Sequence, residues 1–241
     1  MEFFDKKIVF CGDVHGSFGT LGFVINKLHR MKNTIVFVCG DFGMGFNKPA
    51  YYLNELGKLS KQLKTRDNYV IVVRGNHDDP VYFNEVNKFG SGNVILITDY
   101  EVVTVNGYNI LGIGGGISID RTERILDKTY WKDEPVKINE EKLLSLHDID
   151  VIFTHSSPNF CKPFTKDGIL YWIKRDVHLI VDCDKERADL TYIYEELIKN
   201  NKIQYWYYGH FHESFHTSRD ETIFIGLNEL ELKEFMNYKN E

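Results

Sequence analysis

The chain has 241 residues, of which 43% are hydrophobic and 27% are charged, as expected for a soluble globular protein with one sizeable core. Its 35 acidic and 29 basic residues give a net charge of −6, which argues against an anionic-membrane binder and against extended nucleic-acid binding. No apolar stretch approaches the roughly 18 residues of a membrane span. The four cysteines include no C-x-x-C pair, which favours a reduced protein located in the cytoplasm.

The first half of the chain alternates short apolar runs with amphipathic stretches. We predict strands at residues 7–11, 34–39 and 69–73, and helices at residues 17–30 and 50–64. A β-α-β-α-β order implies parallel strands joined by right-handed crossovers. In such sheets, ligands bind at the carboxyl ends of the strands.

The second half contains hairpin signals. Residues 101–105 and 108–113 are predicted strands, and the Asn106-Gly107 pair between them suits a type I′ turn. The other predicted elements are helices at 139–147 and 185–199 and strands at 150–153, 203–208, 215–218 and 222–225. Parallel strands followed by hairpins predict an α/β fold with two packed mixed β-sheets flanked by helices. No repeat or linker divides the chain, so residues 1–241 are expected to form a single domain.

Five short polar motifs each follow a predicted strand directly. They are Gly12-Asp13-Val14-His15-Gly16, Gly40-Asp41-Phe42-Gly43, Gly75-Asn76-His77-Asp78, Thr154-His155 and Gly209-His210-Phe211-His212. Each has an ordinary explanation when taken singly: an Asp after a strand is often a helix N-cap, a lone His is often a surface or core group, and Asn-His-Asp suits a turn.

Taken together, the motifs predict a metal site. All of them lie at one rim of the predicted sheets, and the glycines permit a close approach that a Cβ atom would block. A donor set of Asp, Asn and His without thiolates suits Mn, Fe, Zn or Ni.

In this order, the motifs resemble the calcineurin-like metallophosphoesterase superfamily, whose signature is GD-x-H, GD, GNH-[DE], a single His and GH-x-H. The resemblance covers roughly residues 7–226. It implies a four-layer α/β/β/α sandwich that hydrolyses phosphoesters with two divalent metal ions, for which we expect Mn²⁺ first.

The resemblance also implies a role for each motif residue. The metal ligands would be Asp13, His15 and His212 for one ion, Asn76, His155 and His210 for the other, and Asp41 as the bridge between them. His77 would contact the substrate phosphate or the leaving group. Asp78 would orient and charge the His77 imidazole.

These residue types suit hydrolysis of a phosphoester. A bridging carboxylate offers one oxygen to each of two cations about 4 Å apart, and a hydroxide between the cations can attack phosphorus in line. Metals can lower the pKa of bound water to about 7, so this hydroxide is populated near neutral pH. A histidine held by a carboxylate can protonate the leaving group.

The segment at residues 117–135, which follows the glycine-rich run 112–116, is either an exposed loop or a cap over the substrate. Protein Ser/Thr phosphatases of the superfamily carry Asp-Arg-Gly in the second motif, whereas here Phe42 follows Asp41 and that phosphate-binding arginine is absent. We therefore expect Arg121 or Arg124 to orient the phosphate. Trp131 would then cover a ring or a sugar, which favours a small or nucleotide-like substrate.

Several functions stay open at this point. The leading hypothesis is a phosphomonoesterase or phosphodiesterase, and the alternatives are a Ser/Thr-type protein phosphatase, a nuclease and a catalytically silent metal-binding scaffold. A nuclease needs a basic groove, which the acidic balance disfavours. A silent scaffold is expected to have lost ligand residues, and every expected position is filled.

Overall fold

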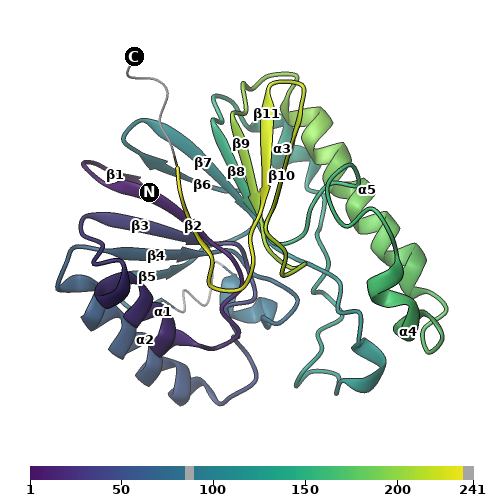
Figure 1. Cartoon of the computed structure of the whole chain (residues 1–241), viewed down its shortest axis with the longest axis horizontal. Coiled ribbons are helices and arrows are strands. Elements are labelled where there is room, and N and C mark those ends of the chain that lie inside the picture. The colour runs from purple at the N-terminus through teal and green to yellow at the C-terminus, as the bar shows by residue number, and fades with distance from the viewer. Residues whose placement is uncertain (85–89, 236–241) are drawn as a thin grey trace.

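Two β-sheets pack face to face at the centre of the molecule, and helices cover their outer faces, in the computed structural model of the chain (Figure 1). The structure describes residues 1–84 and 90–235. The predicted four-layer α/β/β/α arrangement is confirmed. No helix within these two ranges is both long and apolar enough to cross a bilayer.

The first sheet carries the strands predicted from the N-terminal half. Its strands, in the order in which they pair, are β12 (Leu232–Glu234), β2 (Lys7–Cys11), β3 (Thr34–Val38), β4 (Tyr69–Val72) and β5 (Val94–Leu96). The β2–β3 and β3–β4 pairs are parallel, as predicted, β4 and β5 also pair in parallel, and β12 joins β2 in the antiparallel direction. The short strands β5 and β12 were not predicted, because a run of three residues shows no clear periodicity.

The second sheet contains the predicted hairpins. Its strands, in pairing order, are β1 (Glu2–Phe3), β6 (Glu101–Val105), β7 (Tyr108–Ile113), β8 (Val151–Thr154), β9 (Tyr205–Tyr208), β11 (Thr222–Gly226) and β10 (Phe215–Arg219). The β6–β7 and β10–β11 pairs are antiparallel, whereas β7, β8, β9 and β11 pair in parallel. Asn106 and Gly107 have φ angles of 51° and 82°, as a type I′ turn requires.

The helices lie in two groups on opposite sides of the sheets (Figure 1). They are α1 (Phe18–Phe23), α2 (Pro49–Lys64), α3 (Glu140–Ser145), α4 (Leu170–Ile173) and α5 (Leu179–Leu197), with a π-helical turn at Val24–Leu28 and 3₁₀ turns at Pro80–Phe83, Arg121–Glu123 and Asp167–Ile169. The helix predicted at residues 17–30 is therefore α1 followed by the π turn. The helix predicted at residues 185–199 begins earlier, at Leu179.

Alternation along the strands divides the core into three apolar layers. Val9 and Cys11 of β2 face α1 and α2, whereas Ile8 and Phe10 face the second sheet. The Phe10 ring stacks on Tyr207 of β9 with a centroid distance of 3.7 Å. On the far side of the second sheet, Trp206 packs against α5. The layer between the sheets brings the carboxyl ends of strands from both sheets to one edge of the molecule.

Candidate metal centre

The five motifs meet at this edge. Asp13, Asp41 and Asn76 follow strands of the first sheet, and His155 and His210 follow strands of the second. His155 is in direct contact with Asn76, Asp41 and His210. Two sheets therefore contribute side chains to one cluster, as the strand-end positions predict.

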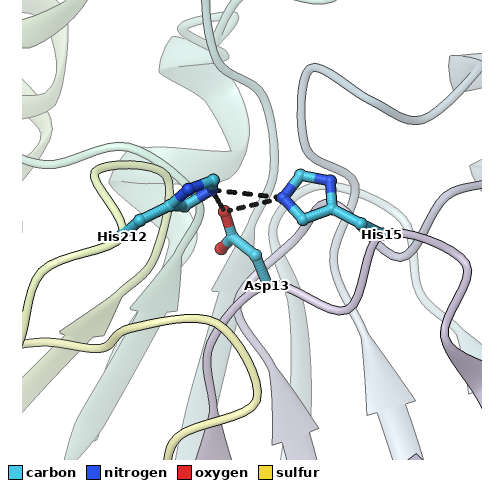
Figure 2. A group of neighbouring side chains, drawn as sticks. All are labelled: Asp13, His15 and His212. Atoms are coloured by element: carbon cyan, nitrogen blue, oxygen red, sulfur yellow. Dashed lines mark hydrogen bonds and ion pairs between the residues drawn. The ribbon is translucent and has the colours of Figure 1, made fainter. Parts of the chain in front are cut away.

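The first ligand group consists of Asp13, His15 and His212 (Figure 2). His212 Nε2 lies 2.9 Å from Asp13 Oδ2 and 3.1 Å from His15 Nε2. His15 Nε2 lies 3.7 Å from the same carboxylate oxygen. Figure 2 shows the two rings approaching the Asp13 carboxylate with their nitrogens turned toward one another. This convergence of lone pairs fits a cation.

The second group surrounds His155. Its Nε2 atom lies 2.8 Å from Asn76 Oδ1, 3.1 Å from His210 Nδ1 and 3.1 Å from Asp41 Oδ1. The other Asp41 oxygen, Oδ2, lies 3.9 Å from Nδ1 of His15 in the first group. The Asp41 carboxylate thus lies between the two groups, the position that a bridging ligand needs.

The charges of the cluster also fit a cation. Burial opposes the ionisation of Asp41, yet the surrounding imidazoles, above all His155, hold the pKa of its carboxyl well below the ordinary value. Burial likewise disfavours the His155 imidazolium, but Asp41 and Asp13 raise its pKa to about 10. A divalent cation held by these residues would balance the same buried carboxylates in place of a proton on the His155 ring.

Motif glycines allow the ligands to approach this closely. A Cβ atom on Gly75 would overlap Oδ1 of Asp41, and a Cβ atom on Gly209 would overlap Oδ1 of Asp13. A Cβ atom on Gly40 would meet the His155 ring. Each glycine thus makes room for a ligand that comes from another motif.

The backbone at the ligands is strained. His15, Asp41, His210 and His212 have φ angles of 48°, 45°, 69° and 49°, in the left-handed region that costs a residue with a Cβ atom about 1 kcal/mol or more. Such strain gathers at functional sites, because it aims side chains that regular strands would point elsewhere.

Ser118 and Glu134 orient the Asn76 side chain. Asn76 Nδ2 donates to Ser118 Oγ at 3.1 Å, and Ser118 donates in turn to Glu134 Oε2 at 2.7 Å. The Asn76 Oδ1 atom is thereby directed to His155. Sequence reasoning missed both residues, although the glycine-rich run before them indicated a tight turn beside the site, and Gly116 does lie against the His155 ring.

Asp78 does not have the predicted contact. Its two oxygens accept hydrogen bonds from the backbone N–H groups of Phe42, Gly43, Met44 and Gly75, at 2.8 to 3.0 Å. Burial and the charge of Asp41 nevertheless raise its pKa to about 6. Asp78 therefore ties the second motif to the third and does not orient the His77 imidazole. The sequence suggested otherwise because the two residues are adjacent.

His77 instead contacts Arg124 of the 117–135 segment. Arg124 Nη2 lies 2.6 Å from His77 Nε2, and His77 Nε2 lies 4.0 Å from Asp41 Oδ2. A guanidinium only donates, so His77 Nε2 is the acceptor in this pair. Burial lowers the His77 pKa to about 4, which keeps the ring neutral. Arg124 thus lies beside His77 at the edge of the cluster and lines the adjacent cavity.

Arg121 and Trp131 do not reach the centre. Arg121 binds Asp176 at 2.5 Å and Asp182 at 2.6 Å, so its guanidinium ties the 117–135 segment to the start of α5. Trp131 is 5% exposed, and its ring packs edge-on against Phe46 at 5.3 Å. Of the two arginines that the sequence offered, it is thus Arg124 that lines the cavity, and the sequence does not show which charges and rings lie opposite the segment.

A cavity of about 600 Å³ opens beside the cluster. Asp41, Asn76, His77 and Arg124 line one end. The remaining wall includes Glu186 and Arg187 of the predicted helix 185–199, together with Phe164, Lys166, Ile169 and Trp172 from a stretch that sequence reasoning left unassigned. No sequence signal pointed to this stretch, because it contains none of the motifs.

The comparisons with known proteins agree with this site. The family model of the calcineurin-like phosphoesterases matches residues 6–214. The chain therefore belongs to the calcineurin-like phosphoesterase family and is a metal-dependent phosphoesterase. Among solved structures it is similar to phosphopantetheinyl hydrolase from Mycobacterium tuberculosis, with a TM-score of 0.52, 15% identity and 98% of each chain covered. That likeness shows the fold. A search of curated proteins finds no match.

Gly75→Ala should weaken metal binding. The new Cβ atom would displace the Asp41 carboxylate, and shifting the support of a metal ligand typically costs about 10–100-fold in affinity. Metal titration followed by calorimetry measures the effect. The control is Gly19→Ala at an exposed position of α1, where a Cβ atom meets nothing within 4 Å. Equal metal affinity in the two variants would contradict the packing argument.

Proposed function

We propose that the protein hydrolyses a phosphoester of a small organic molecule with two divalent metal ions, Mn²⁺ being the first choice. One observation carries the proposal: the Asp, Asn and His ligand set converges at one end of a cavity of about 600 Å³. A cavity of this size accommodates a small molecule. This favours a small substrate over a phosphoprotein or a nucleic acid.

The metal ions would be held by the two groups of ligands joined through Asp41. When bound, they would supply an activated water and neutralise charge on the phosphate. The protein contributes the fixed geometry: the strained backbone and the glycine contacts hold the ligands in position before metal or substrate arrives.

His77 and Arg124 would bind the phosphate at the open side of the cluster. Both side chains line the cavity, and Arg124 Nη2 donates a hydrogen bond to His77 Nε2. A phosphate oxygen between them would accept from the guanidinium and contact the imidazole, so it would replace this pairing. With the Arg124 donor turned to the phosphate, His77 Nε2 would be free to take up a proton and to deliver it to the leaving-group oxygen.

The four cysteines support the proposal of a cytoplasmic protein. All of them are free, and Cys11, Cys39 and Cys161 are buried. Free thiols persist most readily in a reducing compartment.

Activity should depend on two metal ions that share Asp41. Elemental analysis of the metal-saturated protein should give two ions per chain, and Asp41→Asn should lower occupancy at both sites because one bridging oxygen becomes an amide nitrogen. Hydrolysis of p-nitrophenyl phosphate or its diester should stop on chelation and return with Mn²⁺. Asp5→Asn is the control, since Asp5 is exposed and has a similar φ of 55°. A parent protein with one ion or none refutes the dinuclear proposal.

His77→Ala should keep its metal ions but lose about 10²–10⁴ in rate, the usual scale for a positioned acid–base group. Substrates with a good leaving group should be affected less, because they need little protonation. Steady-state kinetics on phenyl and p-nitrophenyl esters, with metal content measured in parallel, test both points. The exposed His29→Ala serves as the control. Loss of metal in His77→Ala would mean that His77 is a ligand.

Arg124→Ala should reduce kcat/KM by about 10–150-fold, because a hydrogen bond to a charged group is worth about 1.5–3 kcal/mol. Arg124→Lys should recover part of this loss, since it keeps the charge without the two-pronged geometry. Arg66→Ala, at the end of α2 away from the cavity, is the control. Parent-like kinetics in Arg124→Ala would remove Arg124 from the phosphate site.

A further inference from the structure

The cavity beside the metal cluster has a polar floor that the phosphate chemistry leaves unused. Glu186 of α5 is 4% exposed, Ser156 is fully buried, and both line the cavity. The two side chains lie close enough to interact with each other, but within residues 1–84 and 90–235 neither Glu186 Oε2 nor Ser156 Oγ has a partner at full hydrogen-bond geometry. Burial raises the pKa of Glu186 to about 7.

A native fold needs a physical reason to keep buried oxygens without hydrogen-bond partners. A buried polar atom without a partner lowers stability, so native folds keep such atoms where water, an ion or a ligand completes them. Glu186 and Ser156 come from different elements, α5 and the loop after β8, and face the same cavity. Two acceptors on one floor are suited to a group that carries O–H or N–H donors.

The walls above this floor are apolar and aromatic. Phe164, Ile169, Trp172 and Phe211 also line the cavity. Phe164 remains 64% exposed, so its ring is free to contact an entering molecule. Flat apolar groups bind between side chains of this type. The cavity therefore combines a metal end for phosphate, aromatic walls for a planar body and a polar floor for hydrogen-bond donors.

We propose that Glu186 and Ser156 determine substrate specificity by accepting hydrogen bonds from the organic group of the phosphoester, and that this group is a nucleoside or a similar planar, donor-bearing molecule. The inference rests on the proposed function, which places the phosphate at the metal end. Glu186 Oε2 takes an O–H or N–H of the ligand. Ser156 Oγ accepts a second hydrogen bond from the ligand, and the ring of the ligand packs against Trp172 and Phe164.

A different role for Glu186 would be to support the metal cluster by its charge, since the carboxylate lies close enough to His155 to interact electrostatically. The two roles differ in what they affect. Charge support predicts loss of metal when Glu186 is replaced. Substrate recognition predicts unchanged metal content and a loss of discrimination between substrates with and without donors.

The test compares matched substrates. The diester pair is thymidine 5′-(p-nitrophenyl phosphate) and bis(p-nitrophenyl) phosphate, and the monoester pair is thymidine 5′-phosphate and phenyl phosphate. In each pair only the thymidine compound carries donors. In Glu186→Leu, the ratio of kcat/KM for the thymidine compound to that for its partner should fall about tenfold or more, because sites built for a hydrogen bond discriminate strongly. Ser156→Ala should lower the same ratio to a smaller extent.

Two further variants and a melting curve complete the test. Glu186→Gln keeps an acceptor and should retain part of the ratio, and Glu195→Leu, the same change on the exposed side of α5, should keep the parent ratio. The melting temperature of Glu186→Leu should equal or exceed that of the parent, because a buried carboxyl oxygen without a partner is removed. A lower melting temperature would indicate a structural role and overturn the proposal.

Binding of thymidine to the metal-loaded protein, measured by calorimetry, separates this inference from the proposed function. We expect the Kd to rise about tenfold or more in Glu186→Leu. An unchanged ratio, a fall in metal content, or no thymidine binding by the parent would overturn the inference. If the parent hydrolyses neither substrate pair, the proposed function fails, and the thymidine titration alone decides the role of the floor.

Discussion

The contact between the two sheets is the constraint on which the site depends. Phe10 and Phe37 of the first sheet pack against Tyr207 and Phe153 of the second, with centroid distances of 3.7 Å for Phe10–Tyr207 and 5.1 Å for Phe37–Phe153. These strands run on directly into the motifs. The first sheet supplies Asp13, His15, Asp41 and Asn76, and the second supplies His155, His210 and His212, so the cluster is complete only when this aromatic layer is packed. Stability of the core and assembly of the site are therefore the same event.

Burying several carboxylates close together at this edge is electrostatically unfavourable, and neighbouring imidazoles and backbone N–H groups offset this cost. Asp13 and Asp41 are almost completely buried, and their charges are balanced by imidazoles and by backbone N–H groups such as that of His77, which donates to Asp41 Oδ1 at 2.7 Å. Asp78 uses its carboxylate to collect four backbone amides and so holds two motif loops together. A cation would complete this balance, which links metal binding to stability.

The substrate side of the site is built from segments outside the motifs. Arg124 reaches the cluster because Arg121, three residues earlier, is anchored to Asp176 and Asp182 near the start of α5. The same region continues into the cavity wall with Trp172 and Glu186. The motifs thus form the candidate metal centre, and segments outside them supply most of the lining of the adjacent cavity. This separation is expected of loops carried on a rigid scaffold.

The ligand cluster and the layer order were predictable from the sequence alone, because both rest on local patterns. A strand that ends in Gly-Asp or Gly-His delivers its polar residue to the sheet edge wherever its partners lie, and the strand periodicity shows which residues face inward. The partners of individual side chains were decided only by the tertiary structure. Arg121 and Arg124 are alike in sequence, yet one pairs with Asp176 and Asp182 near α5 and the other meets His77 as well as Asp120. Trp131 is packed against Phe46 while Trp172 lines the cavity, and Asp78 bonds to backbone amides that lie more than thirty residues away as well as to Gly75. Such contacts depend on what lies across a loop, and sequence spacing carries no information about that.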